Sequence, residues 1–271
     1  MVFETILWLS LLLTVCALCG VVSGVFGIGG GFFVVPVLNF MFMYFYDSIP
    51  NTMAVATTTS LCNICIVNGV SSYRRIPILS KLRPDLPWIM VSSLVAGVIG
   101  SFVAKMASDD FLHVLFPCFL LFVIILRILS RVMASSSLFQ GMVFQRCYYP
   151  MLLIPVGVIC VLCGIGGGLV MFPLMLSIYG DKHAAVSISS FYSLLLSFCS
   201  LIVTIFFPDT YTQYPVIYAN IYLPMIFFSV LVSPFFTQVG AWANSNLSIN
   251  FLDMLLFFLI MLIVFFQWMT Y

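Results

Sequence analysis

Long apolar runs separated by short polar breaks form the dominant pattern of this 271-residue chain. Four runs contain no Asp, Glu, Lys or Arg, and each exceeds the roughly 20 residues that cross a bilayer as a helix; they are 5–46, 48–73, 149–180 and 210–252. The pattern predicts ten membrane segments, at 4–25, 31–46, 51–72, 86–106, 111–131, 149–163, 168–180, 184–207, 215–241 and 247–270. We therefore expect an all-α polytopic membrane protein.

The composition excludes a soluble globular protein. Hydrophobic residues make up 63% of the chain, charged residues make up 6%, and the mean hydropathy is +1.24. Such a chain lacks the charged surface that a water-soluble fold presents to solvent. The nine cysteines lie mostly in apolar runs, where cysteine packs as a small hydrophobic residue. We therefore expect neither a metal site nor a structural disulfide.

The basic residues predict the orientation. With the N-terminus outside, eight of them fall on the cytoplasmic side: Arg74, Arg75, Lys81, Arg83, Arg127, Arg131, Arg146 and Lys182. Only Lys105 then falls outside, beside Asp109 and Asp110. This asymmetry follows the positive-inside rule and places both chain ends outside. Five segments in each half is an odd number, so the second half enters from the opposite face and the two repeats are inverted.

A glycine-rich element followed by a proline occurs twice, and the proline stands nine residues after the first glycine in both copies. The copies are Gly27, Gly29, Gly30 and Gly31 with Pro36, and Gly164, Gly166, Gly167 and Gly168 with Pro173. Glycine clusters break helices, because they remove side-chain cover from the backbone and favour other conformations. Paired broken helices in a duplicated membrane chain indicate the binding site of a transporter.

The duplication divides the chain into a first transmembrane repeat at 1–131, a cytoplasmic linker at 132–148 and a second transmembrane repeat at 149–271. Segment 168–180 is only about 20 Å long as a helix, which is less than the roughly 30 Å hydrocarbon core. About 8–10 membrane segments are therefore expected, including short broken or re-entrant helices. Their non-helical backbone is tolerated at membrane depth only where protein or a wet cavity surrounds it.

Small hydroxyl residues open one predicted helix after each glycine element. They are Thr57, Thr58 and Ser60 in the first half and Ser187, Ser189 and Ser190 in the second. A helix N-terminus carries partial positive charge and unpaired N–H groups, and hydroxyls add further donors. We expect a small anion to bind there. The alternative is that the glycines and hydroxyls serve only the packing of membrane helices.

These elements resemble those of the sulfite exporter TauE/SafE family of membrane permeases, whose halves each carry a G-x-G-G-G element, a following proline and a helix start rich in Thr and Ser. The resemblance covers nearly the whole chain through both repeats. It implies that the glycines, prolines and hydroxyl residues named above form the substrate site. It also implies transport of small sulfur-containing anions such as sulfite or sulfonates.

The leading interpretation is a secondary transporter, or permease, of small anions that works by alternating access between two inverted repeats in a bacterial cytoplasmic membrane. Its expected partners are the anion, the lipid bilayer and a coupling ion, either a proton or sodium; no nucleic acid and no cofactor is expected. A passive anion channel, or a membrane subunit that supports a partner, is the alternative. An enzyme is not expected, because the apolar segments hold no paired carboxylates and no histidine lies within the hydroxyl stretches.

Overall fold

The computed structural model describes residues 2–45, 51–80, 86–134, 149–208 and 217–270. Almost all of these residues are helical, which confirms the all-α prediction. The elements are α1 (Val2–Phe26), α2 (Gly31–Phe45), α3 (Thr52–Arg74), α4 (Ile76–Leu79), α5 (Leu86–Met106), α6 (Asp109–Ala134), α7 (Tyr149–Leu162), α8 (Gly168–Tyr179), α9 (Lys182–Phe206), β1 (Ile217–Tyr218), β2 (Ile221–Tyr222), α10 (Leu223–Asn246) and α11 (Ile249–Thr270).

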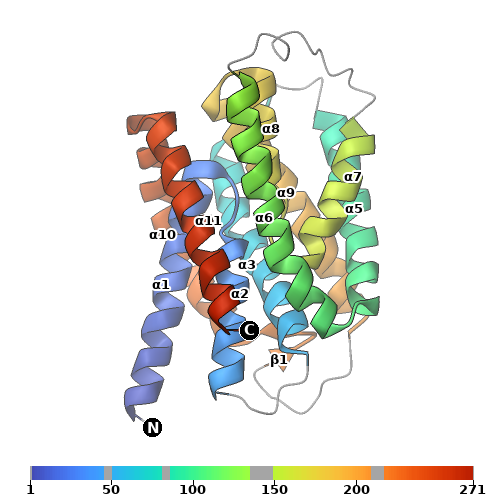
Figure 1. Ribbon diagram of the computed structural model, residues 1–271, viewed down its shortest axis with the longest axis vertical. Coiled ribbons are helices and arrows are strands. Elements are labelled where there is room, and N and C mark those ends of the chain that lie inside the picture. Colours follow the sequence, from blue (N-terminus) through green and yellow to red (C-terminus); the bar gives the residue numbers. More distant parts are fainter. Residues whose placement is uncertain (1, 46–50, 81–85, 135–148, 209–216, 271) are drawn as a thin grey trace.

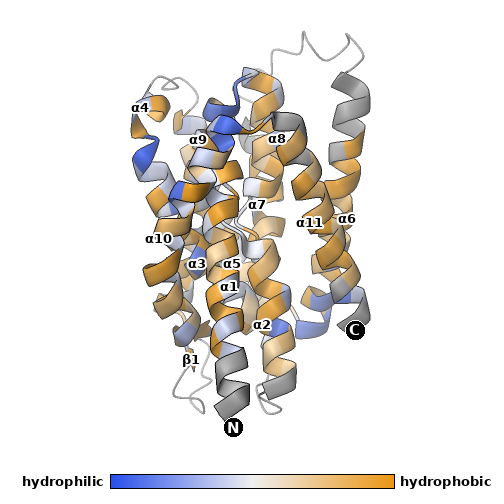
Figure 2. Cartoon of the chain, turned by 90° about the vertical axis from the view of Figure 1, so that its left-hand side faces the viewer, coloured by the Kyte–Doolittle hydropathy of each residue, from blue (hydrophilic) through white to orange (hydrophobic). Residues whose placement is uncertain are grey.

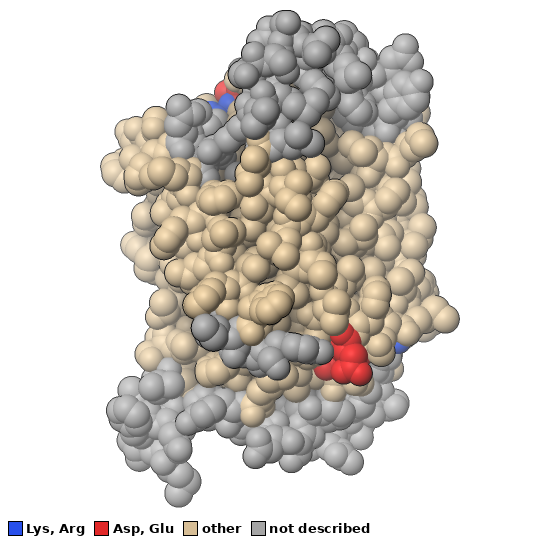
Figure 3. All heavy atoms as spheres, in the orientation of Figure 1, with Lys and Arg blue, Asp and Glu red and all other residues tan. Residues whose placement is uncertain are grey.

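The sides of the helical bundle are apolar, as a membrane environment requires. Within the described residues, six helices are long and apolar enough to cross a bilayer: α1, α3, α5, α6, α9 and α10. Figure 2 shows hydrophobic residues along the height of these helices, and hydrophilic residues near their ends. In the view of Figure 3, charged side chains appear near both ends, and uncharged residues cover the surface between them. The chain is a multi-pass membrane protein.

Two helix pairs enter the bundle and return to the end from which they came (Figure 1). α1 rises from the end that holds the N-terminus, and α2 runs back toward that end. α7 and α8 form the same kind of hairpin from the opposite end. α8 has 12 residues and is therefore about 18 Å long, too short to cross. The predicted re-entrant helices and the inverted order of the two halves are present.

The two halves interlock through their first helices. α1 packs along α10 of the second half, and α7 packs along α5 of the first half. Glycines allow close approach at both interfaces: a Cβ at Gly20 would lie 2.8 Å from the Phe236 Cβ, and one at Gly157 would lie 2.6 Å from the Ala96 Cβ. Gly20 and Gly157 each stand seven residues before the first glycine of their run. The same packing is therefore used twice with the halves exchanged.

Part of the predicted division of the chain lies outside the described residues. α6 continues to Ala134, three residues beyond the predicted end of the first repeat. Residues 135–148, which make up most of the predicted linker, are not described. The boundaries 1–131, 132–148 and 149–271 therefore remain predictions.

The fold predicts that Ser80 and Ser108 lie on opposite sides of the membrane. Both residues are exposed; Ser80 follows α4 at one end of the bundle, and Ser108 follows α5 at the other. In a background without the nine native cysteines, Ser108→Cys should react with a membrane-impermeant thiol reagent in intact cells, and Ser80→Cys should react only after permeabilisation. Labelling of both positions from one side would contradict the arrangement of helices, whereas reversed labelling would contradict only the orientation.

Candidate substrate site

The two glycine turns cross in direct backbone contact. A Cβ added to Gly168 would lie 2.7 Å from the Gly27 carbonyl oxygen and 2.6 Å from the Ile28 Cα. In the mirrored position, a Cβ added to Gly31 would overlap the Gly164 carbonyl oxygen. The turn of each half therefore occupies the space that a side chain on the other half would need. We call this contact the glycine crossing.

The glycine runs end their helices because they adopt backbone angles that other residues avoid. The φ angles of Gly27, Gly29 and Gly30 are +70°, +80° and +75°. Those of Gly164, Gly166 and Gly167 are +65°, +73° and +80°. This left-handed conformation is open mainly to glycine. Pro36 and Pro173 lie within the short helices that follow, at equivalent places in α2 and α8.

The glycine crossing lies near half depth in the bundle. Ile64 is the thirteenth of the 23 residues of α3, and α3 spans about 34 Å at 1.5 Å per residue. A Cβ at Gly29 would lie 2.8 Å from Ile64 Cγ2, and a Cβ at Gly166 would lie at the same distance. Because both turns contact the middle of this crossing helix, the broken backbone is surrounded by protein at membrane depth, as predicted.

Two serine hydroxyls join the halves at the glycine crossing. Ser60 Oγ lies 2.6 Å from the Gly164 carbonyl oxygen and 3.4 Å from that of Gly31. Ser189 Oγ lies 3.2 Å from the Gly168 carbonyl oxygen and 3.3 Å from that of Gly27. Each serine is fully buried. Each hydroxyl therefore lies within hydrogen-bond distance of carbonyls from both halves, and Ser60 and Ser189 hold the crossing together.

Three of the other predicted hydroxyls donate within their own helices. Thr57 donates to the Ala54 carbonyl at 3.0 Å, Ser187 to that of His183 at 2.6 Å, and Ser190 to that of Ser187 at 3.1 Å. Such bonds are common for hydroxyls in apolar helices. Thr58 is half-buried and lines a pocket. Ser190 also contacts the glycine crossing, because a Cβ at Gly27 would lie 3.2 Å from its Cβ. Thr57 and Thr58 lie beside the pocket, and Ser187 belongs to neither group.

The protein's own carboxylates cap both helix starts. The Ala54 and Met53 amides of α3 donate to Asp109 of α6 at 3.0 and 3.4 Å. The His183 and Ala184 amides of α9 donate to Asp181 at 3.1 Å. These N–H groups, which the sequence indicated as donors to an anion, therefore already have anionic partners. Other donors are needed to bind a substrate anion.

A pocket of about 40 Å³ lies next to the glycine crossing, between α3 and α5 of the first half and α9 of the second. We call it the outer pocket, because it lies toward the end of the bundle that is expected to face outside. Its lining consists of Ala54, Thr57, Thr58, Leu61, Ser101, Ala104, Lys105, Leu112, Val161, Ser200, Thr204 and Asn220. A water requires about 10–15 Å³ on this measure, so the pocket has room for a molecule the size of a few waters.

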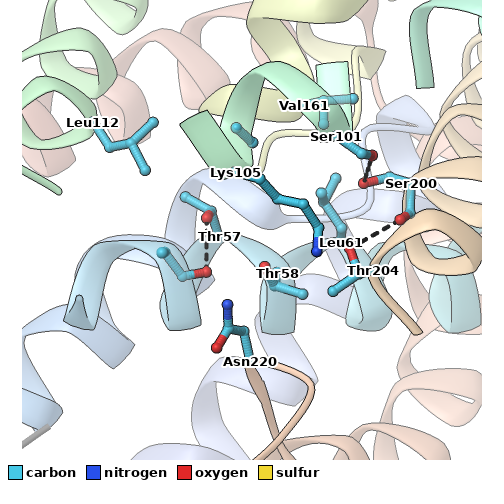
Figure 4. Close-up of a pocket in the computed structure, with 12 residues that line it drawn as sticks. Thr57, Thr58, Leu61, Ser101, Lys105, Leu112, Val161, Ser200, Thr204 and Asn220 are labelled. Carbon is cyan, nitrogen blue, oxygen red and sulfur yellow. Dashed lines mark hydrogen bonds between the residues drawn. The ribbon is translucent and has the colours of Figure 1, made fainter. Parts of the chain in front are cut away.

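Lys105 is the one charged residue in the described lining of the outer pocket. Figure 4 shows its side chain extending into the pocket, with the ammonium toward Thr58 and Thr204. Hydrogen bonds fix the neighbouring hydroxyls: Ser101 Oγ donates to Ser200 Oγ at 2.8 Å, and Thr204 Oγ1 donates to the Ser200 carbonyl at 3.0 Å. An ammonium among hydroxyls binds anions through charge-assisted hydrogen bonds.

The sequence interpretation placed Lys105 at the outer turn and assigned it no role in binding. The available signal was spacing: Ser101 and Lys105 are four residues apart on α5, and Ser200 and Thr204 are four apart on α9. Residues at that spacing share a helix face. Two polar faces within apolar helices predict a polar lining. Their convergence with Asn220 in one pocket depends on tertiary packing.

The comparisons with known proteins agree on a membrane transporter. The sequence pattern of the sulfite exporter TauE/SafE family matches residues 12–266. A probable membrane transporter protein of Methanocaldococcus jannaschii is 32% identical over 192 residues, which cover 69% of this chain and 68% of the relative. A probable membrane transporter protein of Haemophilus influenzae is 26% identical over 262 residues, which cover 90% and 91% of the two chains. No solved structure matches.

The glycine crossing predicts that one methyl group at Gly31 or Gly168 disrupts the protein. Neither glycine has a positive φ, so Gly31→Ala and Gly168→Ala test steric contact alone. Both variants should lower the unfolding temperature and abolish transport in proteoliposomes, because the new Cβ displaces a carbonyl of the other half. Gly69→Ala is the matched control, since its Cβ would meet Leu194 Cδ1 at an ordinary 3.8 Å. Wild-type stability in both test variants would contradict the crossing.

Proposed function

This chain belongs to the sulfite exporter TauE/SafE family, and we propose that it carries a small sulfur-containing anion, such as sulfite or a sulfonate, across the bilayer. The family and the relatives make it a membrane transporter. The proposal adds the substrate, a mechanism of alternating access and a coupling ion, either a proton or sodium. It also assigns separate roles to the paired glycine and hydroxyl residues.

The position of Lys105 in the outer pocket carries this proposal. Lys105 is the next-to-last residue of α5, near the outer end of the bundle, and its side chain extends into the pocket there. The side chain of Lys105 is half-buried in the pocket lining. Thr58, Thr204 and Asn220 supply uncharged polar groups around it. The pocket therefore suits a compact anion that accepts several hydrogen bonds.

The central residues serve the mechanism in this proposal. The glycine runs with Pro36 and Pro173 form the pivot, and Ser60 and Ser189 hold it through carbonyls of both halves. Thr57 connects the pivot to the substrate, because its Cα would lie 2.8 Å from a Cβ at Gly164 and its side chain lines the pocket. Ser187 and Ser190 lie in the second and third turns of α9.

Two observations favour a carrier over a passive channel. The outer pocket is lined by both halves, since α3 and α5 belong to the first and α9 to the second. A movement of one half against the other therefore changes its shape and access. The turns at the glycine crossing also touch backbone to backbone, which leaves no room for an anion to pass between them without such a movement.

Lys105→Gln is expected to weaken sulfite binding to the purified protein. A hydrogen bond to a charged group contributes about 1.5–3 kcal/mol, and each 1.4 kcal/mol is tenfold, so the loss should be roughly 10- to 100-fold. Lys105→Arg should retain most of the affinity, because it preserves the charge. Lys182→Gln is the matched control: it removes one positive charge at the other end of the bundle, and Lys182 does not line the outer pocket.

Equilibrium binding of labelled sulfite to each variant measures this effect, and counterflow in proteoliposomes separates the mechanisms. Saturable uptake with counterflow is expected for the wild type. Unchanged sulfite affinity in Lys105→Gln would remove the outer pocket as the substrate site. Flux that rises linearly with sulfite concentration and shows no counterflow would favour the channel.

A further inference from the structure

A second pocket lies at the opposite end of the bundle and has a volume of about 190 Å³. Its lining combines the end of α3, the start of α9 and part of α10; the residues are Ser71, Arg74, Arg75, His183, Thr237 and Ala241. We call it the inner pocket. Two arginines and a histidine among six lining residues make the inner pocket strongly basic, whereas Lys105 is the one charged residue in the described lining of the outer pocket.

The inner pocket corresponds to the outer pocket when the two halves are exchanged. The outer pocket lies between the start of α3, the end of α5 and the end of α9. The inner pocket lies between the start of α9, the α10 segment that packs on α1, and the end of α3. α5 and α10 are equivalent, because each packs along the first helix of the other half. A transporter built from inverted repeats is expected to use corresponding surfaces on its two sides.

Arg75 is a buried charge in this pocket. Its side chain is only 9% exposed, and its Nη2 donates to the Gly24 carbonyl at 2.7 Å. Burial lowers the pKa of the guanidinium to about 10, so it stays protonated at neutral pH. No Asp or Glu among the described residues lies within ion-pair distance of it. A buried cation of this kind is stabilised by an anion.

The neighbouring side chains supply further donors. Ser71 precedes Arg75 by four residues and is 2% exposed. Its hydroxyl has no hydrogen-bond partner within the described chain, although it lines the pocket. His183 is half-buried on the facing helix. Because a guanidinium has five N–H donors, Arg75 can hold an anion while it remains bonded to Gly24.

We propose that the inner pocket is a second anion-binding site, which holds a small oxyanion between Arg75, Ser71 and His183. Arg75 also joins this site to α1 through its hydrogen bond to the Gly24 carbonyl. Gly24 stands three residues before Gly27, the first glycine of the glycine crossing. This site adds a second anion-binding position to the proposed function. The proposal depends on that function only for the choice of sulfite as the probe. The phosphate of a lipid headgroup has the same recognition chemistry.

The test is sulfite binding to the full chain, purified in detergent and freed of lipid. The wild type should show two classes of site. Arg75→Gln should weaken one class about tenfold or more, and Lys105→Gln should weaken the other. Lys182→Gln is the charge-matched control, because it lies next to His183 but outside the lining of the pocket. Unfolding temperatures without sulfite show whether each variant is folded.

A second variant covers the case in which Arg75→Gln does not fold. Ser71→Ala combined with His183→Gln keeps the bond between Arg75 and Gly24, and it should weaken the same class of site several-fold. Loss of bound phosphatidylglycerol from Arg75→Gln, measured before lipid removal, would assign the site to a headgroup; loss of sulfite alone would assign it to the free anion. The proposal is overturned if the folded Arg75 and Ser71/His183 variants bind both sulfite and lipid as the wild type does.

The binding data also separate this site from the outer pocket. If Lys105→Gln loses one class of site and Arg75→Gln loses none, the inner site is wrong and the proposed function stands. If Arg75→Gln loses one class and Lys105→Gln loses none, the inner site stands and the outer pocket is not the substrate site.

Discussion

The backbone contact between the two glycine turns is the constraint on which the rest of this structure depends. Each turn fits against the other because no side chain separates them at Gly31 or Gly168. Buried Ser60 and Ser189 then lie within hydrogen-bond distance of carbonyls from both halves. These two serines belong to α3 and α9, which run the length of the bundle and line a pocket toward each end. The crossing therefore places the pivot and both pockets on the same two helices.

Charged side chains of both signs have distinct places in this protein. Asp109 and Asp181 cap the starts of α3 and α9, so these carboxylates are held by backbone amides. Lys105 lines the outer pocket and Arg75 lines the inner pocket. Because cations that line a cavity can form charge-assisted hydrogen bonds with anions, both pockets suit anionic ligands.

The sequence predicted the helices and the broken segments well, because apolar runs and glycine clusters are local signals. The predicted segment at 168–180, for example, corresponds to α8 at Gly168–Tyr179. The hydrogen-bond partners of the polar side chains were not predictable, because these bonds join residues that are distant in the sequence. Asp109 caps a helix that begins more than fifty residues earlier, and Ser60 reaches a carbonyl 104 residues away. The hydroxyls at the helix starts were interpreted as ligands for an anion, whereas those of Ser60 and Ser189 lie against the protein's own carbonyls.

Disulfide locking of the two halves tests the central claim, alternating access around the glycine crossing, most directly. Ser101 of α5 and Ser200 of α9 belong to different halves and line the outer pocket with their hydroxyl oxygens 2.8 Å apart. In a background without native cysteines, Ser101→Cys with Ser200→Cys should form a disulfide that stops sulfite counterflow in proteoliposomes. Reduction should restore the flux to the level of the two single variants, which cannot form the cross-link. Undiminished counterflow in the fully cross-linked protein would contradict the account.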